Sequence, residues 1–401
     1  VSLSEKPYKS LTPADYNELL DRIGFSPRIE VLNSNKIRGV KMEKFAFMIH
    51  PIELYDIYRK LKFMEKLPES AVEGIIKRFP PMKISHITGV RSEHSEAEGY
   101  FVACPLTTKQ MIELPEEYVM DKIIKTGKLA EKMGAKILGL GAFTAVVGDA
   151  GITVAKNLNI PVTTGNSYTV ATAIEGTKKA AEIMGKSIKD AQVLVIGAAG
   201  SIGNVCAQIL AKDCKYMTLA GRHTEKLERV ADKILKDTGL SVMITSNVKK
   251  AVRKADVIIT VTSSLDAIIE AEDLKPGAVV CDVSRPRDVS KEVAQKRSDV
   301  LIIEVGVVEV PGDVNFNFNF GFPPKTAYAC MAETMMLALE GRYESFTLGR
   351  ELTVEQVEEI SRIAEKHGFK LAGFRSFERA VTEEQIEKIK ENARRKIERA
   401  C

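Results

Sequence analysis

The sequence lacks the patterns that mark a metal site, a disulfide framework or a secreted chain. Its 401 residues include five histidines and six cysteines, and the cysteines form no C-x-x-C pair and follow no metal-ligand spacing. The segment SLSEKPYKSLTPADY near the N-terminus has no apolar core of the kind found in signal peptides. These absences predict a cytoplasmic protein with reduced thiols and no bound metal.

An excess of charge of one sign is also missing, and so is a convincing membrane span. The net charge is +4 with 28% charged residues, which is too balanced to indicate a nucleic-acid partner. Val193 to Ala211 is uncharged over 19 residues, but its three glycines and its strand-to-helix pattern argue against a transmembrane segment. The length and the 45% apolar content predict a globular protein with more than one domain.

What the sequence does contain is a glycine-rich loop between a strand and a helix. In such a loop the first glycine allows a tight turn, the second lets the backbone approach a pyrophosphate, and the third lets the helix pack close to the sheet. The N-terminus of the helix then offers N–H groups and a positive dipole end to phosphates. The predicted phosphate-binding residues, spaced as G-x-x-G-x-x-G, are Gly197, Gly200, Ser201, Ile202 and Gly203.

The end of the second strand indicates which dinucleotide binds. NAD sites usually place Asp or Glu there to hold the ribose hydroxyls, whereas this chain has Gly221-Arg222-His223-Thr224. The guanidinium of Arg222, with Thr224 beside it, suits a 2′-phosphate, so NADP(H) is the predicted cofactor. Alternatively, Arg222 is a solvated surface charge and both cofactors bind. Thr262, after the fourth strand of this domain, is predicted to line the nicotinamide side.

Alternating strand and helix patterns predict an α/β protein with a Rossmann-type, doubly wound parallel sheet for the cofactor and an α/β substrate domain. The Rossmann strands are predicted near 193–196, 216–220, 241–244, 256–261, 278–282 and 300–304. The predicted parts are an N-terminal extension (1–44), the substrate domain (45–166), the Rossmann domain (167–324) and C-terminal helices (325–401) that carry Cys330 and pack back on the substrate domain.

The last third of the sequence predicts three helices. Pro323-Pro324 precedes a predicted helix from Lys325 to Gly341 that holds Cys330. A second helix is predicted from Val354 to His367. The charged tail after Thr382 has a narrow apolar stripe, which predicts docking on the body of the protein or on a second subunit, as in a homo-oligomer.

Several motifs resemble those of one enzyme family, the acyl-acyl carrier protein reductases that make fatty aldehydes and are best known from cyanobacteria. The shared features are the glycine loop and Leu140-Gly141-x-Phe143-Thr144, Thr163-Thr164-Gly165-Asn166, Gly306-Val307-Val308-Glu309, Ala329-Cys330-x-Ala332-Glu333-x-Met335, Glu340-Gly341, Gly349-Arg350 and His367-Gly368-Phe369. They occur in one order from about Phe45 to Phe369.

The resemblance implies a two-step reduction of an acyl thioester to an aldehyde. A cysteine attacks the thioester and becomes acylated, and NADPH then supplies the hydride that reduces the acyl group. Carried onto this sequence, the nucleophile is Cys330, and the donor is an acyl carrier protein or coenzyme A thioester. Departures from the family pattern at Asp149, Ala150 and Asn315 to Phe320 leave the chain length and the carrier open. The Phe/Asn alternation predicts a strand with one apolar face or the lining of an acyl passage.

Each assigned residue has an alternative. Cys330 has apolar neighbours and would otherwise be a buried core cysteine, while Cys104 is the competing thiol. His50, at the end of the first predicted strand, is a candidate proton relay or a hydrogen-bonded structural histidine. Glu309 and Glu333 flank the cysteine in sequence, and either is a candidate general acid or base, or an ion-pair partner.

Two other functions fit the same residues. One is an NADP-dependent hydroxy- or amino-acid dehydrogenase resembling shikimate dehydrogenases, which needs a proton relay and no covalent step. The other is a non-catalytic protein that binds the nucleotide without turnover. Only the reductase forms a covalent acyl-enzyme, so an acyl group trapped on the protein would distinguish it from these two alternatives.

Overall fold

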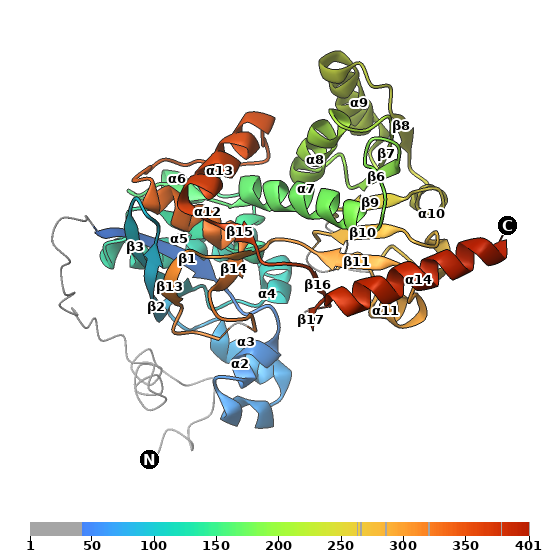
Figure 1. Ribbon diagram of the computed structural model, residues 1–401. Coiled ribbons are helices and arrows are strands. Elements are labelled where there is room, and N and C mark those ends of the chain that lie inside the picture. Colours follow the sequence, from blue (N-terminus) through green and yellow to red (C-terminus); the bar gives the residue numbers. More distant parts are fainter. Residues whose placement is uncertain are drawn as a thin grey trace. The chain divides into compact units, whose positions relative to one another are not determined.

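The computed structural model describes residues 42–262, 264, 267–284, 287–319, 321–377 and 379–400. The chain divides into two compact units (Figure 1). The first unit holds the chain up to Thr164 together with Pro311–Pro324 and Thr334–Gly349. The second holds Gly165–Val310, Lys325–Glu333 and the chain from Arg350 onward. Nearly all of the predicted extension 1–44 lies outside the described residues.

A six-stranded sheet of described residues forms the centre of the first unit, in the order β13-β2-β3-β1-β4-β5. Strands β3, β1, β4 and β5 are parallel, whereas β2 and β13 each run antiparallel to their neighbour. The bounds are Met42–Ile49 (β1), Met82–Arg91 (β2), Glu96–Ala103 (β3), Leu138–Leu140 (β4), Val162–Thr163 (β5) and Gly312–Asn315 (β13).

Several helices belong to the first unit. They are α2 (Leu54–Tyr58), α3 (Glu69–Ile76), α4 (Thr108–Glu113), α5 (Glu116–Lys132) and α6 (Ile152–Lys156), with 3-10 turns at Lys62–Lys66 and Ala142–Ala145. The long helix α5 buries Val119, Ile123 and Ala130, which recur at helical spacing. They share a hydrophobic core with residues of β1 such as Met48.

The Phe/Asn stretch after β13 keeps its alternation of buried and exposed side chains, although the strand ends at Asn315. Phe316 is buried and stacks on Phe101 with ring centroids 6.1 Å apart, and Phe318 meets Phe101 edge-on at 5.9 Å. Asn317 has a φ of 47°, which turns the chain out of extended geometry. The apolar face is therefore present, and the acyl passage stays a prediction.

The second unit contains the predicted Rossmann sheet (Figure 1). Its parallel strands lie in the order β11-β10-β9-β6-β7-β8, which is the strand order of dinucleotide-binding sheets. Two short antiparallel strands, β16 and β17, extend it beyond β11. The bounds are Gln192–Ile196 (β6), Tyr216–Ala220 (β7), Met243–Thr245 (β8), Val257–Thr260 (β9), Val279–Asp282 (β10), Leu301–Glu304 (β11), Arg375–Ser376 (β16) and Arg379–Ala380 (β17).

The helices of this unit alternate with the strands, as predicted. They are α7 (Asn166–Ile183), α8 (Ser201–Ala211), α9 (Thr224–Thr238), α10 (Val248–Val252), α11 (Lys291–Lys296), α13 (Val354–His367) and α14 (Glu383–Ala400), with a 3-10 turn at Ala271–Asp273. A three-stranded sheet adds β12 (Val307–Glu309), β14 (Thr326–Tyr328) and β15 (Lys370–Leu371), and α12 (Ala329–Leu339) begins in this unit.

The contacts divide the chain differently from the predicted boundaries in its last ninety residues. Residues 311–324, predicted in the Rossmann domain, belong to the first unit, because β13 pairs with β2. The C-terminal helices are predicted to pack on the substrate domain; the part of α12 from Thr334 onward does belong to the first unit, whereas the described residues from Arg350 onward belong to the second. The reason is apolar contact: Val357 of α13 and Ile386 of α14 join the core around the Rossmann sheet.

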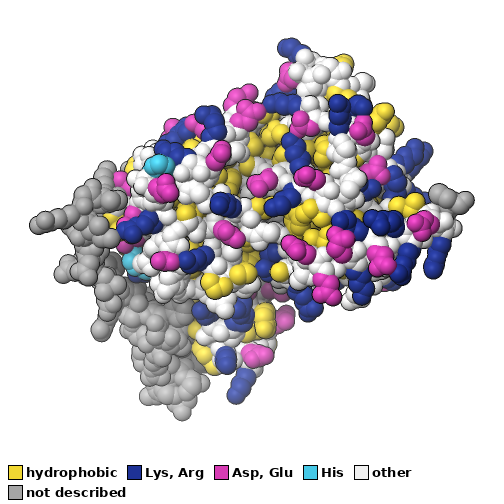
Figure 2. Space-filling view, viewed as in Figure 1, with side chains coloured by type: hydrophobic (Ala, Val, Ile, Leu, Met, Phe, Trp, Pro, Cys, Tyr) yellow, Lys and Arg dark blue, Asp and Glu magenta, His cyan; other side chains and the backbone are white. Residues whose placement is uncertain are grey.

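Acidic and basic side chains are interspersed over the face of the molecule drawn in Figure 2, as expected for solvated helix surfaces. Among the helices in the described ranges, none combines the length and the apolar character needed to cross a membrane.

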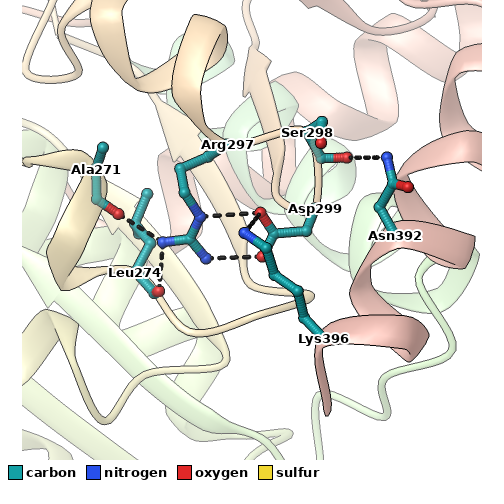
Figure 3. Close-up of polar contacts among 7 residues, drawn as sticks. All are labelled: Ala271, Leu274, Arg297, Ser298, Asp299, Asn392 and Lys396. Carbon is teal, nitrogen blue, oxygen red and sulfur yellow. Dashed lines mark hydrogen bonds and ion pairs between the residues drawn. The ribbon is translucent and has the colours of Figure 1, made fainter. Parts of the chain in front are cut away.

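A buried aspartate anchors α14 at the end of the chain (Figure 3). Asp299, just before β11, has 0% exposure and accepts hydrogen bonds from Arg297 Nε (2.9 Å) and Nη2 (2.8 Å) and from Lys396 Nζ (2.7 Å). Asn392 of α14 donates to the Ser298 carbonyl at 3.1 Å. Burial alone would raise the pKa of Asp299, but the hydrogen bonds from Arg297 and Lys396 outweigh it and keep the pKa below its ordinary value. The helix thus docks on its own unit, and a homo-oligomer through it stays a prediction.

We expect Asp299→Asn to destabilise the fold by about 3 kcal/mol, because it leaves two cations without their buried counter-charge. In the wild type, the lowered pKa means that this stabilisation is full above the ordinary carboxyl pKa of 3.8 and is lost as the pH falls through the lower folded-state pKa. Urea unfolding and hydrogen exchange of α14 measure both effects. Asp213→Asn, which removes the exposed Lys178–Asp213 pair, is the matched control and should cost below about 1 kcal/mol.

Candidate functional site

The glycine loop adopts the geometry that its spacing predicts. Gly197 follows β6 with a φ of +83°, and a side chain there would place its Cβ 2.1 Å from the Val261 carbonyl oxygen. A Cβ on Gly203 would lie 2.4 Å from the Gly197 carbonyl oxygen. Both positions therefore require glycine, the first for the turn and the second for the close packing of α8 on the sheet.

The N-terminus of α8 fits a phosphate group. Gly200 is the N-cap and no side chain caps the helix, so the first N–H groups of α8 are not satisfied by a cap. The hydroxyl of Ser201 is buried and has no hydrogen-bond partner among the described residues. Ile202 packs against the core of the unit. Bare glycine backbone, a helix N-terminus and an orphaned hydroxyl together suit the pyrophosphate of a dinucleotide.

An exposed basic residue follows β7, the second strand of the Rossmann sheet in chain order. Arg222 follows β7 and is exposed, His223 is the N-cap of α9, and Thr224 is its exposed first residue. Since Gly221 to Thr224 contains no carboxylate, nothing in this turn repels a 2′-phosphate. The turn is thus compatible with either dinucleotide. The guanidinium of Arg222 has paired N–H donors that suit the 2′-phosphate of NADP(H).

Thr262 lies beyond the end of β9 at the same edge of the sheet, but its polar groups point inward. Its Oγ1 donates to Asp288 at 2.5 Å and accepts from the Ser264 N–H at 3.1 Å. Its own N–H donates to Ser284 Oγ at 2.9 Å. The hydroxyl is thereby committed to the protein, so the contribution of Thr262 to a cofactor site is through its backbone and methyl group.

Cys330 lies at the carboxyl-end edge of the same sheet. The predicted helix from Lys325 was wrong in its first residues: β14 occupies Thr326–Tyr328, because it pairs antiparallel with β12, and α12 begins at Ala329. The Ala329 N–H donates to the Gly306 carbonyl, two residues beyond β11, at 2.7 Å. The glycine loop leaves β6 at this edge, three strand spacings or about 14 Å along the sheet.

The N-terminus of α7 packs directly on the backbone of Cys330. Gly165 is the N-cap of α7 with a φ of +75°, and a Cβ there would lie 2.3 Å from Cys330 Cα and 2.4 Å from Cys330 Cβ. The N-cap of α7 is thus a glycine, with no side chain of its own to cap the helix. This close approach brings the positive end of the α7 dipole beside the cysteine.

A buried carboxylate completes the helix cap. Glu333, with 0% exposure, accepts from Ser167 Oγ at 2.5 Å and from the Tyr168 N–H at 3.1 Å, both in the first turn of α7. Glu333 lies three residues after Cys330, on the same face of α12. A capping carboxylate 165 or more residues away in sequence from its helix gives no local sequence signal, so sequence reasoning missed this role.

The thiol of Cys330 is neutral at physiological pH. Burial, and then the negative charge of Glu333, raise the pKa of Cys330 to about 12, which outweighs the lowering expected at a helix start. Of the five described cysteines, four are buried and Cys330 keeps some exposed surface. The competing Cys104 is fully buried, and burial raises its pKa to about 12. An attack by Cys330 therefore requires a proton acceptor.

His50 and Glu309 occupy different settings. His50, next to β1 in the first unit, accepts from the Phe143 N–H at Nε2 (3.0 Å), and its Nδ1 lies 3.0 Å from the Pro51 carbonyl oxygen. Burial lowers the pKa of His50, and both ring nitrogens have backbone partners. Glu309 is exposed at the end of β12, opposite Thr326. Catalytic roles for both stay predictions.

Within the described ranges, no group of three or more His, Cys, Asp or Glu side chains is placed to hold a metal ion.

Comparison with known proteins supports an NAD(P)-dependent oxidoreductase. A family model described as shikimate / quinate 5-dehydrogenase matches residues 178–306. The long-chain acyl-[acyl-carrier-protein] reductase of Synechococcus elongatus is 25% identical over 307 residues, covering 72% of this chain and 87% of that protein. A glutamyl-tRNA reductase of Natronomonas pharaonis is 33% identical over 99 residues, 24% of this chain and 21% of that protein.

A further relative is much longer. The aminotransferase PigE of a Serratia species is 27% identical over 361 residues, which are 86% of this chain and 42% of PigE. The chain thus spans less than half the length of PigE. Taken with the glycine loop, these similarities make the chain a distant homologue of the cyanobacterial acyl-carrier-protein reductase, within the superfamily of NAD(P)-dependent reductases and dehydrogenases.

Proposed function

We propose that the chain catalyses the NADPH-dependent reduction of an acyl thioester to an aldehyde, with Cys330 as the nucleophile. The observation that carries the proposal is the position of Cys330: the residue keeps some exposed surface and lies at the carboxyl-end edge of the Rossmann sheet, against the N-terminus of α7. Substrates of open α/β sheets bind at this edge. A buried core cysteine would need neither feature.

The relatives' names support the substrate class. The cyanobacterial relative is named a reductase of acyl groups on acyl carrier protein, and the archaeal relative a reductase of glutamyl-tRNA. In both names an acyl group is attached to a carrier before it is reduced. We therefore propose acyl carrier protein or coenzyme A as the carrier. A cytoplasmic location is proposed because the five described cysteines form no disulfide with one another.

The proposed chemistry assigns a role to each group around Cys330. As Sγ attacks the thioester carbonyl, the thiol proton passes to the Glu333 carboxylate and then to the departing carrier thiolate, which leaves an acyl-cysteine and a free carrier thiol. The positive end of α7 favours the negative charge that develops on the carbonyl oxygen. The glycine loop and Arg222 would hold NADPH, which would supply the hydride that, with one proton taken up, converts the acyl-cysteine to aldehyde and free thiol.

Intact-protein mass spectrometry tests the proposal. Incubation with acyl-ACP and acyl-CoA of several chain lengths should add the mass of one acyl group at Cys330, and subsequent NADPH should remove that mass and release aldehyde. Peptide mapping locates the adduct. If no thioester in the panel acylates the protein, or if the adduct persists with NADPH, the proposed reaction is wrong.

Cofactor choice gives a separate prediction. We expect Arg222→Ala to weaken NADPH binding about 10- to 100-fold and NADH binding by less than about twofold, because a bidentate contact to a phosphate contributes roughly 1–3 kcal/mol. Fluorescence titration measures both affinities. Arg229→Ala, which removes an exposed arginine of the neighbouring helix α9, is the matched control and should change neither. Equal losses for both cofactors would remove Arg222 from phosphate recognition.

The family model over residues 178–306 favours a second candidate, a hydroxy- or amino-acid dehydrogenase without a covalent step. That match ends before Cys330 and β14, so it covers the cofactor sheet and not the cysteine. Under this alternative, no acyl-enzyme forms, Cys330 is dispensable, and turnover of a hydroxy or amino acid with NADP⁺ is measurable.

A further inference from the structure

A second buried aspartate lies at the carboxyl-end edge of the Rossmann sheet, and the reaction proposed above leaves it without a role. Asp288, between β10 and α11, has 0% exposure. Its carboxylate accepts hydrogen bonds from Thr260 Oγ1 (2.5 Å), Thr262 Oγ1 (2.5 Å) and the Thr262 N–H (3.1 Å), and also from Ser284 Oγ. All four partners are hydrogen-bond donors, which suits the acceptor oxygens of the Asp288 side chain.

These bonds tie together the segments that follow β9 and β10. The Asp288 carbonyl also accepts from the N–H groups of Ile268 (2.8 Å) and Ile269 (3.1 Å), and Ile269 forms a parallel bridge with Val289. Asp282 at the end of β10 accepts from the Ser284 and Val289 N–H groups at 3.0 Å. A polar network that crosses two strand ends in this way fixes both of them in one geometry.

The fixed segment borders the glycine loop. Val261, next to Thr262, presents the carbonyl that a Cβ on Gly197 would meet at 2.1 Å. Since the chain passes from Gly197 into the phosphate-binding turn, a shift of Val261 or Thr262 changes the wall on which a bound dinucleotide lies. Asp288 itself is enclosed and cannot reach a ligand.

We infer that Asp288 is a positioning residue for cofactor binding, which acts by holding Thr262 and its neighbour Val261 against the glycine loop. The inference rests on the proposed dinucleotide site but not on thioester chemistry. It also makes the predicted role of Thr262 more specific: the hydroxyl bonds to Asp288, and the cofactor would meet the backbone that this bond fixes.

A double-mutant cycle on cofactor affinity tests the inference. Asp288→Asn and Thr262→Val should each raise the dissociation constant of NADPH about tenfold, and the double variant should show about the same tenfold rise, because both changes disrupt the same hydrogen bond between Thr262 Oγ1 and Asp288. The Michaelis constant for the cofactor should rise while kcat at saturating cofactor stays within about twofold, since the reacting groups are untouched. Thr262→Val retains the shape of the side chain. If Asp288→Asn folds poorly, the NADPH affinity of Thr262→Val alone still tests the inference.

Asp299→Asn is the matched control. Asp299 is equally buried and hydrogen-bonded in the same unit, but it lies at the amino end of β11. It should lower stability and leave the NADPH affinity of the folded protein unchanged. The inference is overturned if Asp288→Asn behaves like this control, or if the effects of Asp288→Asn and Thr262→Val multiply. Fluorescence measures NADPH affinity directly and requires no thioester reduction. If the wild type binds NADPH but reduces no thioester, the proposed function is wrong, and the affinities of the variants still test the role of Asp288.

Discussion

Cys330→Ala abolishes aldehyde formation while the protein still binds NADPH: this is the largest effect that we expect from a single substitution. Removal of a covalent nucleophile costs about 10⁴-fold or more in turnover where no other group replaces it. The glycine loop leaves the sheet three strands away from Cys330, so cofactor affinity should change by less than about twofold. Aldehyde release from acyl-ACP with NADPH, together with fluorescence titration of NADPH, measures both quantities.

Cys104→Ala is the control for this experiment, because Cys104 is the thiol that competes with Cys330 in the sequence. It is fully buried beyond β3, so its loss should reduce stability by about 1 kcal/mol and leave acylation intact. If Cys104→Ala is inactive and Cys330→Ala forms aldehyde at a rate comparable to the wild type, the nucleophile is Cys104 and not Cys330. Aldehyde formation by both variants would exclude a covalent step through either thiol.

The pH dependence of acylation follows from the thiol. Burial and the charge of Glu333 raise the pKa of Cys330 to about 12, so the thiolate fraction is small at neutral pH and grows tenfold with each unit. Simple thiolate chemistry therefore predicts a rate that climbs steadily with pH. The proposed transfer of the thiol proton to Glu333 predicts instead an acylation rate that is nearly flat around neutrality, so a rate that climbs tenfold with each pH unit would contradict this role of Glu333.

The cofactor half of the fold was predictable because its signals are local. The strands β6, β7, β9, β10 and β11 lie within one or two residues of their predicted positions, since buried parallel strands are short apolar runs between turns and helices. The φ of Gly197 and the tight packing of Gly203 follow from the spacing of the glycines. Such features require only residues that are near in sequence.

The surroundings of Cys330 were not predictable, because they depend on contacts between distant segments. The sequence predicts a helix where β14 lies, whereas Thr326 and Tyr328 favour a strand and the pairing of this segment with β12 decides its structure. The cap of α7 comes from Glu333, and the loop after β9 is held by Asp288, 26 residues after Thr262. Neither the hydrophobic periodicity nor a motif of the sequence indicates these contacts between distant residues.

We expect Gly165→Ala to lower the rate of acylation strongly and to leave the cofactor site unchanged. The substitution tests the geometry around Cys330 more directly than a change of the thiol does. The left-handed φ of +75° costs an alanine about 1 kcal/mol. In addition, the new methyl group would lie 2.3 Å from Cys330 Cα, so the backbone of one segment must move. A displacement near 1 Å of a reacting group costs about 100-fold in rate. We expect that loss in acylation, with NADPH affinity unchanged.

Gly185→Ala separates the clash from the backbone strain. Gly185 follows the other end of α7 with a φ of +71°, and a Cβ there meets nothing within 4 Å. Both variants therefore carry the same strain of about 1 kcal/mol, and only Gly165→Ala displaces Cys330. If the two variants acylate equally fast at equal folded fractions, the contact between α7 and Cys330 has no part in the reaction. If only Gly165→Ala is slow, the position of the sulfur relative to the N-terminus of α7 limits the rate.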